Sequence, residues 1–201
     1  MNPYLVTGLV MCGVIIVALV GTSYLAVYFT RRAKADLEQL LTPLAEHLDG
    51  KADVDNASVE GTWGGTIVQA RMAAAAAGTV RVWQVDLIDA AGGEAWNYVY
   101  SRPKKGQIEP EIDIVTENRE IAGMLGKIDR EVLEPLQPDA TDWVQVEYSP
   151  EGGYVRVARP MHGRNDIPAP ERLETDLRFL QQIGDENRAL QERLRAEGEV
   201  E

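Results

Sequence analysis

Few side chains in this sequence are suited to nucleophilic or metal chemistry. The 201 residues include two histidines, His47 and His162, and a single cysteine, Cys12. Zinc sites are built from three or four ligands at short spacings, which these residues do not supply. The sequence also lacks the Walker, dinucleotide-binding, zinc-protease and nucleophile-elbow motifs. It therefore predicts no cofactor, no metal site and no catalytic residue.

One polar stretch, residues 159–166 with the sequence RPMHGRND, brings cations and a histidine close together. Arg159, His162 and Arg164 are candidates for a small anion-binding loop, because their side chains donate charge-assisted hydrogen bonds. The same composition is typical of a solvated surface loop, where polar residues collect. The sequence leaves both interpretations open.

Acidic residues dominate the charge balance. The chain has 32 Asp and Glu against 20 Lys and Arg, which gives a formal net charge of −12. Nucleic-acid binding requires a basic surface that neutralises phosphates, so no nucleic-acid partner is predicted. Carboxylates and arginines in a pocket of a sheet would suit a membrane-anchored small-ligand sensor or hydrolase, which is the alternative to a non-enzymatic protein.

All charged residues follow residue 30, and the segment from Leu5 to Phe29 is apolar and uncharged. As a helix it is about 37 Å long, and a bilayer core of about 30 Å needs about 20 residues. A cleaved signal peptide is the rival interpretation. It is disfavoured because no basic residue precedes the apolar stretch and no small-residue cleavage site follows it. The sequence predicts a transmembrane anchor over residues 1–30.

Three basic residues, Arg31, Arg32 and Lys34, follow the apolar segment directly. Lys and Arg beside a membrane span stay on the cytoplasmic side. We therefore expect a single-pass protein of the plasma (inner) membrane, with its N-terminus outside and its C-terminal domain in the cytoplasm. These side chains are also expected to contact anionic lipid head groups, at about 1 kcal/mol each.

Small residues recur within the apolar segment. Ala18, Thr22 and Ala26 are spaced by four and share one helical face, while Gly13 and Gly21 lie on another. Small residues let transmembrane helices approach closely, although they are also common in spans that have no specific partner. We expect this surface to be a helix-packing interface with transmembrane helices of another protein.

Beyond the span, leucines at helical spacing predict an amphipathic connector helix over residues 31–50, interrupted at Thr42 and Pro43. Alternation of apolar and polar residues then predicts strands. They cover residues 59–63, 66–72, 81–89, 94–102, 143–148 and 154–159. Short connections between the first four strands favour an antiparallel meander. At least two of Trp83, Trp96 and Trp143 should lie in the core or an interface.

Two helices complete the pattern, one from Thr116 to Leu133 and one that begins at Pro170. The order β-β-β-β-α-β-β-α predicts an α+β domain over residues 51–183, with helices on one face of an antiparallel sheet. We expect residues 184–201 to form a polar helical tail that projects. Asn187 occupies an a-type position in that tail, which favours a weak homo-oligomer through the C-terminal helix.

These features together predict a non-enzymatic function. The apolar anchor, the acidic domain and the missing catalytic motifs favour a non-enzymatic accessory or scaffold subunit of a larger membrane protein complex. The expected partners are membrane lipid and the transmembrane helices of another protein.

Overall fold

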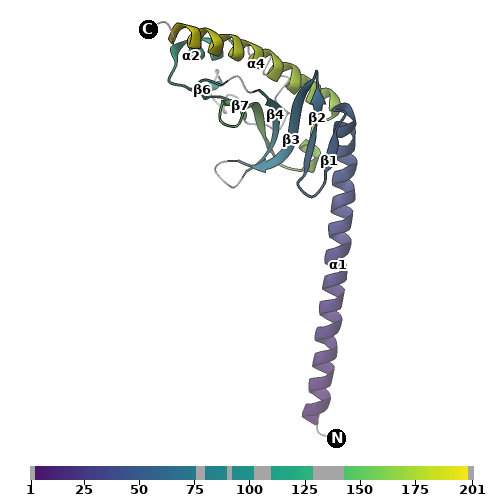
Figure 1. Ribbon diagram of the computed structural model, residues 1–201. Coiled ribbons are helices and arrows are strands. Elements are labelled where there is room, and N and C mark those ends of the chain that lie inside the picture. Colours follow the sequence, from purple (N-terminus) through teal and green to yellow (C-terminus); the bar gives the residue numbers. More distant parts are fainter. Residues whose placement is uncertain (1–2, 76–79, 90–91, 102–109, 129–142, 199–201) are drawn as a thin grey trace. The chain divides into compact units, whose positions relative to one another are not determined.

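The computed structural model describes residues 3–75, 80–89, 92–101, 110–128 and 143–198 (Figure 1). The chain divides into two compact units, residues 1–39 and residues 40–201. The described residues of the first unit are helical throughout, whereas the second unit contains a β-sheet and further helices.

Helix α1 runs from Pro3 to His47, and Pro43 lies inside it. The predicted interruption at Pro43 is therefore wrong, although a proline inside a helix removes one backbone hydrogen bond. Leu41, Leu44 and Leu48 are fully buried in the second unit. Burying each such side chain contributes about 1.5–3 kcal/mol, so packing of these leucines outweighs the cost of the proline.

Eight strands form one antiparallel sheet in the second unit. They are β1 (Lys51–Asp53), β2 (Ser58–Trp63), β3 (Thr66–Ala74), β4 (Arg81–Ile88), β5 (Trp96–Ser101), β6 (Glu111–Val115), β7 (Trp143–Ser149) and β8 (Tyr154–Met161). The spatial order is β1-β2-β3-β4-β8-β7-β5-β6. The predicted α+β class is confirmed.

All six predicted strands form, and the β2–β3 turn uses Gly64 and Gly65 with positive φ angles of 58° and 85°. This conformation is the one that two-residue hairpin turns require. The edge strands β1 and β6 were not predicted. Six strands rather than four therefore precede the first helix after the sheet begins.

The predicted meander of the first four strands is wrong in one place. Strands β2, β3 and β4 pair in sequence order, but β8 and β7 lie between β4 and β5. Strand β4 has buried residues on both faces, including Val82 and Asp86 on one and Trp83 and Val85 on the other. The backbone groups of a strand that is buried on both faces cannot be left without partners, and pairing with β3 at one edge and β8 at the other satisfies them.

Helix α2 (Arg119–Leu125) is shorter than the predicted helix over residues 116–133, because it ends at the C-cap Gly126 and residues 126–128 are no longer helical; residues 129–142 lie outside the described residues. Its N-cap is Asn118 rather than Thr116. The Asn118 Oδ1 atom accepts hydrogen bonds from the amides of Glu120 (2.8 Å) and Ile121 (3.4 Å). The Thr116 hydroxyl instead accepts from the Asn118 amide.

After a short 3-10 turn, η2 (Arg164–Asp166), helix α4 (Pro170–Gly198) packs against β4 and β8 (Figure 1). The core lies between this helix and the sheet. Its fully buried residues include Trp83, Tyr98, Tyr148, Leu173 and Leu177. Trp96 is also buried, so the expectation that at least two of the three tryptophans enter the core is confirmed.

Helix α4 continues through Gly184 without a break. The expected projecting tail is not observed, because Asn187, Leu190 and Gln191 are all buried. The Gln191 side chain binds the backbone of Glu94 on both sides, donating to its carbonyl oxygen (3.1 Å) and accepting from its amide (3.2 Å). Asn187 therefore contributes to the packing of its own chain.

Candidate functional site

Helix α1 carries a long apolar surface that is uncovered among the described residues. Every side chain from Met11 to Phe29 is exposed. By length and composition, this is the one helix among the described residues that is apolar enough to cross a membrane. The apolar stretch of this helix is 0% buried, whereas a core helix of a soluble protein buries such side chains. A membrane anchor and an N-terminal signal sequence share this composition.

The small residues singled out in the sequence lie on this uncovered surface. Ala18, Thr22 and Ala26 are exposed, and no heavy atom lies within 4 Å of a Cβ built on Gly13 or Gly21. The Thr22 hydroxyl donates to the carbonyl oxygens of Ala18 (2.9 Å) and Leu19 (3.0 Å). Its polar group is therefore satisfied within the helix, as an apolar environment requires.

The three basic residues that follow, Arg31, Arg32 and Lys34, are exposed and continue the same helix. A cluster of cations directly after an apolar helical segment matches the charge pattern expected at a membrane surface.

In the second unit, directly opposed residues form a row across the whole sheet, which we call the polar row. Its polar members are Lys51, Glu60, Gln69, Asp86, Arg156, Glu147 and Asn97, and the row ends at Val115 of β6. Arg159, three positions after Arg156, pairs with Asp176 of α4. Because side chains alternate along a strand, the polar row lies on the sheet face opposite α4.

Arg156 is the centre of the polar row. Its Nε and Nη2 atoms donate to the two carboxylate oxygens of Asp86, at 2.6 and 2.8 Å, and its Nη1 atom donates to Glu147 at 2.9 Å. The guanidinium also lies 4.1 Å from the centre of the Tyr154 ring. Burial lowers the pKa of Arg156, but hydrogen bonds to Asp86 and its negative charge outweigh this, so the pKa lies above its ordinary value.

This network joins three strands through one cation. The Asp86 side chain is only 4% exposed, and Arg71 of β3 adds a second, longer contact to it at 3.7 Å. A carboxylate that acts as a general base must reach a proton of its substrate. Both oxygens of Asp86 instead accept hydrogen bonds from Arg156, and this geometry stabilises the pairing of β4, β8 and β7.

The anion-binding loop predicted from Arg159, His162 and Arg164 is not assembled as expected. Arg159 belongs to β8, its side chain is 3% exposed, and its Nη1 atom lies 2.7 Å from Asp176 of α4. His162 and Arg164 are exposed beyond the strand. The carboxylate of Asp166 accepts the amides of His162 (2.7 Å) and Gly163 (2.9 Å), so an acidic side chain of the chain itself occupies this turn.

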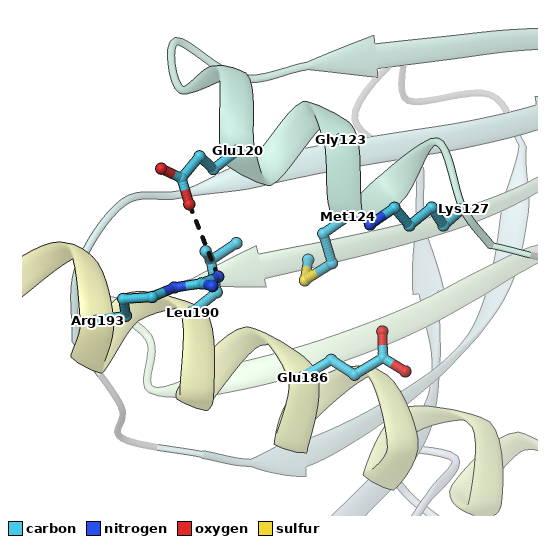
Figure 2. Close-up of a pocket in the computed structure, with 7 residues that line it drawn as sticks. All are labelled: Glu120, Gly123, Met124, Lys127, Glu186, Leu190 and Arg193. Atoms are coloured by element: carbon cyan, nitrogen blue, oxygen red, sulfur yellow. Dashed lines mark ion pairs between the residues drawn. The ribbon is translucent and has the colours of Figure 1, made fainter.

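A cleft of about 410 Å³ lies between α2 and α4 and was not predicted (Figure 2). It is lined by Glu120, Gly123, Met124, Lys127, Glu186, Leu190 and Arg193. The Glu120 and Arg193 side chains approach across it to 3.6 Å, and the Met124 side chain points into it. The helical spacing of these residues is visible in the sequence, but the pairing of the two helices is not.

Among the described residues, no three His, Cys, Asp or Glu side chains are grouped so that they could hold a metal ion. The uncovered apolar helix, the polar row and the α2–α4 cleft are three features of the described residues that could bear on function. Comparison of the chain with protein-family models, curated proteins and solved structures found no match.

Proposed function

We propose that this chain is a single-pass, membrane-anchored, non-enzymatic accessory or scaffold subunit of a larger membrane protein complex. The observation that carries the proposal is the exposed apolar surface from Met11 to Phe29. Water does not tolerate a helix that is apolar on every side, whereas a bilayer favours it.

The same proposal orients the chain. Arg31, Arg32 and Lys34 lie at the C-terminal end of the apolar surface, and the segment before it has no charged side chain. The acidic domain then lies in the cytoplasm beside the plasma (inner) membrane, and the N-terminus lies outside. A basic or apolar surface on the partner would be favoured by the net negative charge of the domain.

The partner is bound through the span. Between helices in lipid, apolar side chains gain little by leaving lipid tails, so close packing of small residues supplies the association energy. The face formed by Ala18, Thr22 and Ala26 is exposed and has its one hydroxyl satisfied internally. It is the part of the span best suited to contact another helix.

Alkaline extraction of membranes and reporter fusions test the anchor and its orientation. The chain should remain in the membrane pellet with its N-terminus intact, and a C-terminal reporter should be active only in the cytoplasm. Replacing Arg31, Arg32 and Lys34 by Ala should weaken this orientation, because the charge bias is removed. A shortened chain released outside the cytoplasm would identify residues 1–30 as a signal sequence and overturn the proposal.

A pull-down from mild detergent tests the partner. The double variant Ala18→Leu, Ala26→Leu keeps the span hydrophobic but enlarges the proposed contact, so recovery of a stoichiometric membrane partner should fall. The matched control is Val20→Leu, Val27→Leu, which enlarges the opposite face of the helix and should leave recovery unchanged. Equal recovery with both variants would remove this face from the proposal. A wild-type chain that brings down no partner would overturn the accessory role.

A second function is favoured by one specific observation, the α2–α4 cleft. Its volume lies within the range of small-ligand sites, and its walls carry the carboxylates Glu120 and Glu186 and the guanidinium of Arg193. A membrane-anchored small-ligand sensor or hydrolase would use these groups. Screening for ligands that raise the unfolding temperature of the wild-type chain, but not of Glu186→Gln, distinguishes this function from the first.

A further inference from the structure

Strand β6 is the most exposed strand of the sheet. Four of its five residues are exposed, and the side chains of Ile112 and Val115 are 42% and 57% exposed. Among the described residues, β6 has a single strand neighbour, β5, with which all five residues pair in register. Its other edge therefore offers backbone donors and acceptors that no described strand uses.

The opposite edge of the sheet is protected in a way that β6 is not. Strand β1 has only three residues and carries Lys51 in its sequence KAD. Short length and lysine are two of the devices by which proteins prevent pairing at an edge. Strand β6 has neither device, contains no proline and pairs with β5 without a bulge.

The side chains of β6 select what can pair with it. Ile112 and Ile114 lie opposite Tyr100 and Tyr98 of β5, on the core face of the sheet. Glu111 and Asp113 alternate with them on the other face and are exposed. Like charges opposite one another destabilise strand pairs, so a second copy of β6 is disfavoured as a partner. A strand with apolar residues at alternate positions and Lys or Arg between them is complementary.

We infer that the edge of β6 that no described strand occupies binds an extended, basic segment of another protein, which adds a strand to the sheet. Backbone hydrogen bonds provide the binding energy, and the alternation of apolar and basic side chains provides the specificity. This inference rests on the proposed function, since it supplies a docking surface on the domain of a partner-binding subunit. It does not involve the membrane span.

The test uses the purified full chain in an uncharged detergent and a short synthetic peptide of alternating Lys and Val. The peptide should bind, whereas the corresponding Glu and Val peptide should not. Two further peptides carry N-methyl groups, one on every Lys and the other on every Val. Alternate amides of a strand point to opposite edges, so one methylated peptide should lose binding while the other keeps it.

Two protein variants alter the net charge by the same amount. Together they distinguish strand pairing at β6 from nonspecific electrostatic attraction between the acidic chain and the basic peptide. Asp113→Lys should weaken binding of the Lys and Val peptide by at least about ten-fold, because it places like charges opposite one another. Glu60→Lys changes an exposed position of β2, near the opposite edge of the sheet. This variant should leave peptide binding nearly unchanged.

Several results would overturn the inference. They are absence of peptide binding, equal binding of the two methylated peptides, and equal effects of Asp113→Lys and Glu60→Lys. Self-association of the full chain that Asp113→Lys abolishes would identify a second copy as the occupant. The span variant Ala18→Leu, Ala26→Leu should bind the peptide like the wild type, so failure at β6 and failure of the span contact are distinguishable.

Discussion

The Nε1 atom of Trp96 donates a hydrogen bond of 2.8 Å to Oδ1 of Asn187, and both residues are buried. The bond joins β5 to the middle of α4, although the two residues are 91 positions apart in the chain. Asn187 therefore acts as the acceptor for a core tryptophan of its own chain. A polar residue within an apolar helical stripe can therefore satisfy a buried donor of its own chain. It does not have to set the register of a coiled coil.

Replacement of Asn187 by Leu should lower the free energy of unfolding by about 1–3 kcal/mol, because the indole N–H of Trp96 would be buried without an acceptor. Urea unfolding of the full chain in detergent measures the change. Adding Trp96→Phe removes the orphaned donor, so the double variant should lose less stability than the two single losses summed. A single Asn187→Leu variant as stable as the wild type would contradict this role.

Replacement of Asp176 by Asn should be more damaging. The Asp176 side chain is fully buried and is bonded to Arg159, whose charge would remain in the core without compensation. Breaking a buried ion pair from one side typically costs about 3–5 kcal/mol. The control is Asp185→Asn, in an exposed pair with Arg188, where about 0–1 kcal/mol is expected. Equal losses in the unfolding experiment would show that the buried pair is not important for stability.

Tyr148 should make the fold sensitive to alkaline pH. Burial and the nearby charge of Asp89 raise its pKa above the ordinary value of 10.0, against the opposing effects of Arg195 and Arg188. The folded chain then holds this proton at pH values where the unfolded chain releases it. The stability contributed by Tyr148 is complete below about pH 10 and is lost as pH rises through the folded-state pKa.

The measurement compares unfolding midpoints of the wild type and Tyr148→Phe between about pH 8 and about pH 11, a range that brackets the ordinary tyrosine pKa. The wild type should lose more stability than the variant over this interval. Other tyrosines and lysines titrate in both proteins, so the difference isolates Tyr148. The prediction is wrong if the two pH profiles are parallel.

Gly61 lies where β2 crosses the end of α1. A Cβ atom at this position would collide with the carbonyl oxygen of Leu48 and lie 2.7 Å from its Cβ atom. Gly61→Ala should therefore destabilise the chain by about 1–3 kcal/mol, as overpacking of a core does. Gly123→Ala is the matched control. No heavy atom lies within 4 Å of its added carbon, and alanine is the better helix former in α2 by about 0.5–1 kcal/mol. Thermal unfolding should show opposite signs for the two variants.

The sequence was sufficient for the strands and helices with strong periodicity. Trp96, Tyr98 and Tyr100 occupy every second position of β5, and all three are buried. Strand β6 was missed although Glu111 to Ile114 alternate between acidic and apolar residues, because the strand has only five residues and four of them are exposed. Local patterns also do not encode which strands become neighbours, and for that reason the insertion of β8 and β7 beside β4 was not foreseen.

The candidate sites also divide into those that local sequence patterns predict and those that depend on contacts between distant parts of the chain. The apolar helix was predicted from composition alone. Its apolar stretch is 0% buried among the described residues. Arg159 was assigned to a polar loop because Arg, His and Asp are adjacent in the sequence. Its partner, Asp176, comes from α4, and no local signal indicates that α4 crosses β8 at that point. The polar row was missed for a similar reason, since its members come from every strand of the sheet.

The ion pair between Asp86 and Arg156 also has a consequence for the order of events during synthesis. The two residues are 70 positions apart, so β4 can pair with β3 early but must wait for β8 to leave the ribosome. In that interval one edge of β4 and its apolar side chains are open to solvent. The sheet is completed late, long after the apolar N-terminal segment has emerged, and a chain halted before residue 154 would leave that edge of β4 without its partner.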